Sequence, residues 1–235
     1  MPGKNTIKTY EKDAYYHLYN RGVNKLHIFQ DDQDYAVFLS YLKTYLEPKD
    51  EQTLLHIISD EHAPWREKDQ AVKLLRLNNF FDTITLLAFC LMKNHFHMLV
   101  RQTDADAIDR FMNSLCTRYT MYFNKKYKRV GPLFQSTYKA VRITTDDQLV
   151  YITRYIHRNP IKKMYDNTLS SRILSTFQYS SYPNYLGIRH ADWVKPDEIL
   201  LYFGKSNQTY QSFVEDNTNE ENSDRIIGNC MLDEI

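Results

Sequence analysis

The stretch CLMKNHFHMLV, residues 90–100, decides the fold of this chain. It is apolar on both sides of His95 and His97, as expected for a central strand of a sheet. Side chains two residues apart on a strand point to the same face, so both imidazoles share one face while Phe96 and Met98 share the other. Two neutral imidazoles on a rigid sheet provide half of a divalent-metal site, although this spacing alone is a weak signal.

Outside this strand, apolar periodicity and capping residues predict the remaining elements. In chain order they are a strand at 15–20, a helix at 33–46, strands at 83–92 and 95–101, a helix opened by 104–106 and running to about 126, extended structure at 133–143, and a helix opened by 145–147 and ended by Pro160. This order predicts an α+β fold with a ferredoxin-like (RRM-like) antiparallel sheet and helices packed on it.

The length of 235 residues allows one large domain, or a domain with an appendage. Residues 48–80 read as an insertion, within which 67–77 could form a short helix. The polar composition of residues 217–235 predicts a disordered tail.

Three cysteines without paired spacing argue against a disulfide framework or a zinc ribbon, and favour a reducing compartment. The N-terminus lacks the apolar core of a signal peptide, and no apolar run approaches the roughly 20 residues of a membrane span. We therefore expect a cytoplasmic protein without a membrane partner.

The formal net charge is only +1, but residues 110–145 contain no acid. The bases of this stretch are Arg110, Arg118, Lys125, Lys126, Lys128, Arg129, Lys139 and Arg142. Aromatic rings are interleaved with them, among them Tyr119, Tyr122, Phe123, Tyr127, Phe134 and Tyr138. Cations for phosphates and flat rings for bases are what single-stranded nucleic acid requires, whereas a solvated helix face followed by a basic hairpin is the plainer alternative.

In the last predicted helix, Tyr155 and Asn159 are one turn apart and share a flank of the apolar stripe. Arg154 and Arg158 are also one turn apart, and the helical wheel places them on the far face, toward water. A tyrosine that packs on the sheet and an asparagine that caps the helix before proline would give the same pattern, so the pair alone does not establish a site.

Four segments, in this order and spacing, resemble the HUH single-tyrosine transposases, specifically the branch of REP-associated tyrosine transposases. They are YHLYNRG (16–22), FCLMKNHFHMLV (89–100), YFNKKYKRVGPLFQSTYKA (122–140) and YITRYIHRNPIKK (151–163). The resemblance covers roughly residues 12–216. It implies the HUH endonuclease fold, with a catalytic domain in residues 1–165 and a C-terminal extension in 166–216.

The resemblance also assigns roles to residues. The metal ligands of the family fall on His95, His97 and Asn159, which would hold Mg²⁺ or Mn²⁺, and its nucleophile falls on Tyr155. It implies metal-dependent nicking and rejoining of single-stranded, hairpin-bearing DNA through a 5′-phosphotyrosine. Tyr151, one turn before Tyr155, is the rival nucleophile. No general base can be named.

The candidate DNA contacts are Arg21, Arg118, Lys125, Lys126, Lys128, Arg129, Lys139 and Arg142. Two other functions stay open: a domesticated protein that binds single-stranded nucleic acid without cutting it, and a metal-dependent phosphodiesterase in which water attacks. A homodimer is also open, because the minimal relatives swap their tyrosine helices between two chains, whereas residues 166–216 make this chain different from them.

Overall fold

The computed structural model of the chain describes residues 10–161, 167–204, 209–216 and 225–228. A four-stranded antiparallel sheet with strand order β2-β3-β1-β4 lies at its centre. The strands are β1 (Ala14–Arg21), β2 (Ile84–Met92), β3 (His95–Gln102) and β4 (Lys139–Ile143). With helices on both faces, this order confirms the predicted ferredoxin-like α+β fold.

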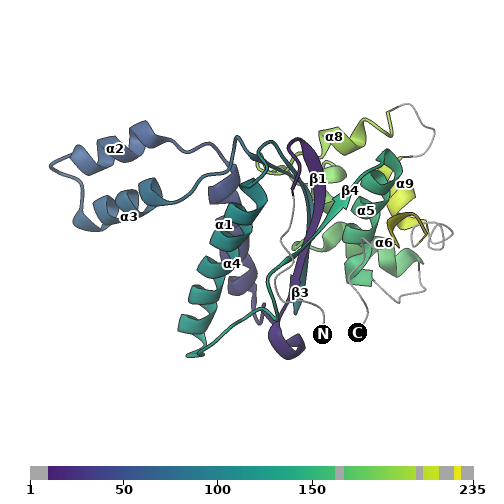
Figure 1. The fold of residues 1–235 in the computed structure, drawn as a ribbon, viewed down its shortest axis with the longest axis horizontal. Helices are drawn as coiled ribbons and strands as arrows, with labels where there is room; N and C mark the ends of the chain where they lie inside the picture. The colour runs from purple at the N-terminus through teal and green to yellow at the C-terminus, as the bar shows by residue number, and fades with distance from the viewer. Residues whose placement is uncertain (1–9, 162–166, 205–208, 217–224, 229–235) are drawn as a thin grey trace.

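Helices α1 (Asp32–Leu46) and α4 (Ala107–Lys126) cover one face of the sheet (Figure 1). The core beneath them is mostly aromatic and aliphatic, and it includes Leu18, Phe38, Phe96, Met98 and Phe111. The short turn η1 (Val23–Lys25) leads from β1 toward α1. Gly22 opens this turn, and a Cβ atom there would lie 2.2 Å from the Leu26 carbonyl oxygen, so only glycine fits.

Helix α5 (Asp146–Arg158) covers the other face and continues into the turn η2 (Asn159–Ile161). The chain then forms α6 (Asn167–Thr176), α7 (Tyr182–Tyr185), α8 (Asp197–Leu200) and α9 (Tyr210–Glu215) on the same side of the sheet (Figure 1). A second core joins these helices to the sheet, and it includes Leu99, Ile152, Ile156, Tyr182 and Phe213.

Two arginines that we predicted to face water instead fasten α5 to α9. Arg154 and Arg158 are only 2% and 7% exposed. Arg154 Nε donates to the Phe213 carbonyl oxygen at 2.9 Å, and Arg158 Nη1 donates to that of Val214 at 2.8 Å. Carbonyls in the last turn of a helix lack intrahelical partners, and the guanidinium groups supply them. The prediction was wrong because it placed α5 on the sheet alone, whereas α9 covers its outer face.

Residues 48–80 contain a helical hairpin of α2 (Glu51–Ser59) and α3 (Trp65–Arg76), which extends away from the sheet (Figure 1). Ala71 is the buried residue of α3, and Trp65 is 78% exposed. At the base of the hairpin, Lys49 Nζ donates to the carbonyl oxygens of Leu75 and Leu77 at 3.1 and 2.5 Å. The hairpin therefore packs mainly on itself.

Strand β4 is shorter than the extended structure expected at 133–143. The chain before it pairs instead with the end of β1, where Gln135 N donates to the Arg21 carbonyl oxygen at 2.9 Å. Of the tail predicted to be disordered, 217–224 and 229–235 lie outside the described residues, and the short helical segment at 225–228 buries Ile227. In the described part of the chain, no helix has both the length and the apolar character of a membrane span.

Candidate active site

His95 and His97 share the face of the sheet that α5 covers, as their two-residue spacing predicts. Their ring centroids are 5.0 Å apart, with the planes at 86°. His97 is fully buried, whereas His95 at the start of β3 is half-buried. Phe96 points to the opposite face, where it contacts Phe38 of α1. The strand thus presents the two imidazoles together, with His95 nearer to solvent.

Helix α5 brings Tyr155 and Asn159 to this histidine pair. An apolar stripe holds the helix on the sheet and contains Leu149, Ile152 and Ile156. The Tyr155 ring stands edge-on to the His97 ring, with centroids 5.4 Å apart and planes at 86°. One turn later, Asn159 Oδ1 lies 3.5 Å from His95 Nε2. The four residues that the sequence singled out are therefore neighbours within one chain.

The backbone of α5 fixes the orientation of the Asn159 amide. Asn159 Nδ2 donates to the Tyr155 carbonyl oxygen at 2.9 Å, and because a carbonyl can only accept, this contact identifies the nitrogen end of the amide. Oδ1 is then the atom that faces His95. On the other side of the ring, His95 Nδ1 lies 2.7 Å from Asn94 Oδ1, so that His95 Nε2 is turned toward Asn159.

The donor set suits a small divalent cation. Within the described ranges, no group of three His, Cys, Asp or Glu side chains could hold a metal, and the Asn159 oxygen is the side-chain donor that lies beside His95. Two ligands that share such an ion at about 2.1 Å in octahedral geometry lie roughly 3 Å apart. The 3.5 Å between His95 Nε2 and Asn159 Oδ1 is close to that separation. The site residues remain a prediction.

Tyr151, the rival nucleophile, faces away from the histidine pair. Its ring packs edge-on against Phe213 of α9, with centroids 5.1 Å apart. Tyr155, by contrast, contacts the rings of His97 and His17. The geometry therefore favours Tyr155 over Tyr151 as the candidate nucleophile.

His157, which lies between Tyr155 and Asn159 in sequence, belongs to the packing of the C-terminal helices. It is fully buried, its Nδ1 is 2.6 Å from Tyr210 Oη, and its Nε2 is 2.7 Å from Ser181 Oγ. Burial, aided by the positive charge of Arg189, lowers the pKa of His157 to about 3. His157 thus stays neutral and holds α5 against the segment that follows it.

His17 is a site residue that the sequence reasoning missed. It is fully buried at the middle of β1, and its Nε2 lies 2.9 Å from His97 Nδ1. The sequence predicts a strand at 15–20 but no role for the histidine within it. The alternation of this strand was the available signal, because Tyr15, His17 and Tyr19 must share one face of a strand that neighbours the His95 strand.

The candidate DNA contacts do not form one surface. Lys125, Lys126, Lys128 and Arg129 belong to α4 and the turn after it, which lie in the layer on the opposite face of the sheet. Several of the candidates also have protein partners. Lys126 is paired with Asp31 and Asp34, Arg118 stacks on Tyr41, Arg129 donates to the Pro132 carbonyl oxygen, and Arg142 bonds Glu11.

Two of the candidates, Arg21 and Lys139, are on the face of the sheet that carries the histidines. Arg21 on β1 is the direct register partner of His95, and Lys139 on β4 is the partner of Tyr19. Arg21 Nε is buried and makes no hydrogen bond within the described residues. These two cations are therefore the ones placed to contact an anion bound at the histidine pair.

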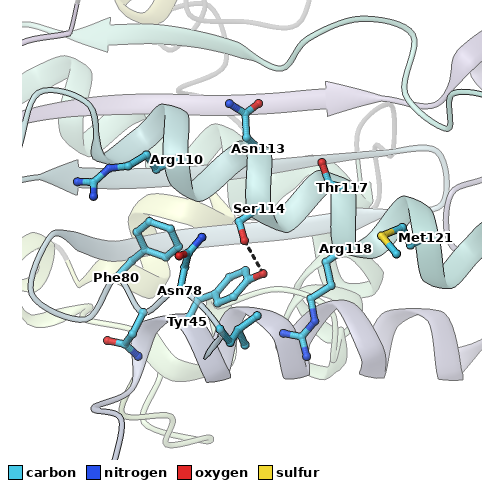
Figure 2. A pocket seen from close by; sticks show the side chains of 11 residues that line it. Tyr45, Asn78, Phe80, Arg110, Asn113, Ser114, Thr117, Arg118 and Met121 are labelled. Atoms are coloured by element: carbon cyan, nitrogen blue, oxygen red, sulfur yellow. Dashed lines mark hydrogen bonds between the residues drawn. The ribbon is translucent and has the colours of Figure 1, made fainter. Parts of the chain in front are cut away.

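One cavity borders the site, and another lies apart from it. A cavity of about 560 Å³ includes His95 and Pro160 in its wall, together with the rings of Phe29, Tyr35, Phe177 and Tyr179. A cavity of about 640 Å³ lies on the opposite face of the sheet, between α1, α4 and residues 77–80 (Figure 2). The latter contains Arg110 and Arg118 but none of the four central residues.

Comparison with known proteins gives one family and a distant structural relative. Residues 72–159 match the family described as IS200-like transposases. A solved REP-associated tyrosine transposase bound to a REP hairpin is similar at 14% identity and a TM-score of 0.42, over 81% of this chain and 91% of that one. No curated protein matches the chain.

Proposed function

We propose that this chain, whose residues 72–159 match the IS200-like transposase family, nicks and rejoins single-stranded DNA with Tyr155 as the nucleophile. The matched region contains His95, His97, Tyr155 and Asn159. The observation that carries the proposal is that these residues, from a strand and a helix far apart in sequence, are neighbours in the fold.

The residues at the site have separable roles. His95 Nε2, an imidazole nitrogen of His97 and Asn159 Oδ1 would hold the cation. When bound, a divalent cation such as Mg²⁺ or Mn²⁺ supplies Lewis acidity to the phosphoryl oxygens. All three ligands are neutral, so the cation keeps its charge for an anionic phosphate. The imidazoles also favour Mn²⁺ over Mg²⁺ in affinity, since Mg²⁺ prefers oxygen ligands.

Tyr155 would carry the covalent step. Its Oη forms a bond to phosphorus while the bond from phosphorus to the 3′ oxygen breaks, and the phenolic proton is lost as the 3′-OH forms. The product is a 5′-phosphotyrosine and a free 3′-OH. Because the phosphate ester is retained, a 3′-OH from another strand can reverse the step and rejoin DNA without ATP.

The strand would be held by charge and by stacking. Arg21 on β1 and Lys139 on β4 lie beside the histidine pair on the same face of the sheet and suit phosphates near the cut. The aromatic walls of the cavity beside His95 suit an unstacked base. The aromatic cavity favours a single strand over a duplex, because the bases of a duplex are already stacked.

A denaturing gel tests the proposal. The protein is incubated with labelled single-stranded DNA from the flanks of its own gene and Mn²⁺, alongside Tyr155→Phe, Tyr151→Phe and His97→Ala. We expect label at the mass of the protein in the wild type and in Tyr151→Phe, and none in the other two variants. Nicking without an adduct would show that water attacks. Binding of the DNA with neither nicking nor an adduct would show a protein that binds DNA without cutting it.

A further inference from the structure

His17 and His97 form a buried pair beneath the proposed nucleophile. Each is 0% exposed, and their rings are nearly parallel, at 18°, with centroids 5.1 Å apart. His17 Nε2 and His97 Nδ1 are 2.9 Å apart, which is a hydrogen-bond distance. The pair joins β1 to β3 through side chains, next to the backbone ladder that already joins them.

This contact restricts which nitrogen of His97 can bind a metal. In a neutral imidazole, one nitrogen carries the proton and the other carries the lone pair. Because Nδ1 of His97 is engaged by His17, Nε2 is the nitrogen that a metal would use. A lone pair on Nε2 requires the proton on Nδ1, and that proton then points at His17 Nε2.

We infer that His17 is a positioning residue, which accepts a hydrogen bond from His97 Nδ1–H and so holds the Nε2 lone pair of His97 toward the metal site. The inference rests on the proposed function, in which His97 is a ligand. Partners that fix the tautomer and ring orientation of a ligating histidine are a general requirement of metal sites, and their loss weakens metal affinity by about 10–100-fold.

The fold keeps His17 in place for this task. It lies at the middle of β1, with Leu99 of β3 and Val141 of β4 as its register partners. Its ring also contacts the rings of Tyr19 and Tyr155, at centroid distances of 4.9 and 5.9 Å. A side chain held between two strands and beneath α5 can fix the orientation of its neighbour. His17 thereby contacts both His97, the proposed metal ligand, and the ring of Tyr155, the proposed nucleophile.

Two substitutions separate hydrogen bonding from packing. His17→Phe keeps an aromatic ring but removes the acceptor, whereas His17→Gln keeps a polar terminus at the position of Nε2 and can accept through its amide oxygen. Thermal unfolding of both variants shows whether they fold. The metal readout is the affinity for Mn²⁺ alone, measured by electron paramagnetic resonance of free Mn²⁺. Long-range ¹H–¹⁵N NMR of the metal-free protein identifies the tautomer of His97 directly.

We expect His97 to be protonated at Nδ1 in the wild type. Folded His17→Phe should lose that preference and bind Mn²⁺ about 10–100-fold more weakly, while His17→Gln stays within a few-fold of the wild type. The NMR result needs neither metal nor DNA, so it is independent of the proposed function. A wild-type His97 protonated at Nε2, or Mn²⁺ affinities that change equally in both variants, would overturn the inference. Failure of the wild type to form an adduct would overturn the proposed function alone.

Discussion

Arg21 is the cation best placed to contact a phosphate at the site, because it lies directly opposite His95 with a buried Nε. We predict that Arg21→Gln weakens binding of single-stranded DNA severalfold at 0.1 M salt. It should also reduce the slope of log K against log salt by about 0.7, the value for one phosphate contact on a single strand. Fluorescence anisotropy over a salt series measures both.

Lys43→Gln is the matched control for Arg21→Gln. It removes the same charge from α1, on the opposite face of the sheet, where Lys43 pairs with Glu47. Affinity and salt slope should match those of the wild type in this variant. An equal loss of affinity in the two variants would mean that net charge, and not the position of Arg21, governs binding.

At the level of single residues, the sequence predicted which side chains of a strand or a helix lie together. It did not predict that His17 contacts His97 from the neighbouring strand. The two-residue spacing of His95 and His97 and the one-turn spacing of Tyr155 and Asn159 survive in the fold because each depends only on local periodicity. The contact of His17 with His97 depends on which strands are neighbours and on their register. That register is a property of the whole sheet, and no local pattern contains it.

Helix α5 depends on α9 for its outer packing, and Arg154 is the main connection. We predict that Arg154→Leu lowers the free energy of unfolding by about 2–4 kcal/mol, because buried carbonyl oxygens of α9 lose a charged donor. Urea unfolding followed by circular dichroism measures the loss. Arg66→Leu on the exposed face of α3 is the control and should change stability by less than about 0.5 kcal/mol.

The same helix shows why element boundaries were easier to predict than element surroundings. The start of α5 follows from Thr145, whose side chain accepts from Gln148 N, and its end follows from Pro160. The burial of Arg154 and Arg158 follows from residues about 60 positions later. A helical wheel identifies the apolar face of α5 that packs on the sheet. It does not show that α9 covers the opposite, polar face.

For the whole molecule, the buried His157 makes stability depend on pH. Burial, aided by the charge of Arg189, lowers its pKa to about 3, whereas an unfolded histidine has a pKa near 6.5. Between these values the unfolded chain takes up a proton that the folded chain does not, so stability falls as the pH falls below 6.5. We predict that His157 contributes about 2 kcal/mol of this loss at pH 5.

Urea unfolding at pH 7.5 and pH 5.0 measures this contribution. His157→Gln should show a smaller drop between the two pH values than the wild type. His190→Gln, at a side chain that is 92% exposed, should keep the drop of the wild type. Equal pH dependence in His157→Gln and the wild type would contradict the account of this residue.

The arrangement of α5 also bears on whether two chains share a site. Tyr155 contacts His97 of its own chain, and α9 anchors the helix on its outer face. We therefore predict that mixing Tyr155→Phe with His97→Ala does not restore the protein–DNA adduct. An adduct that appears only in the mixture would show that chains exchange α5, as the open homodimer alternative requires.

The central claim is that Tyr155 forms the covalent bond to DNA, and peptide mapping of the adduct tests it most directly. Trypsin cuts after Arg142, Arg154 and Arg158, so it places the two candidate tyrosines in separate peptides, 143–154 and 155–158. After nuclease trimming, tandem mass spectrometry should find the remaining nucleotide on Tyr155 in the peptide 155–158. A nucleotide on Tyr151, or DNA that is cut while both peptides stay unmodified, would contradict the account.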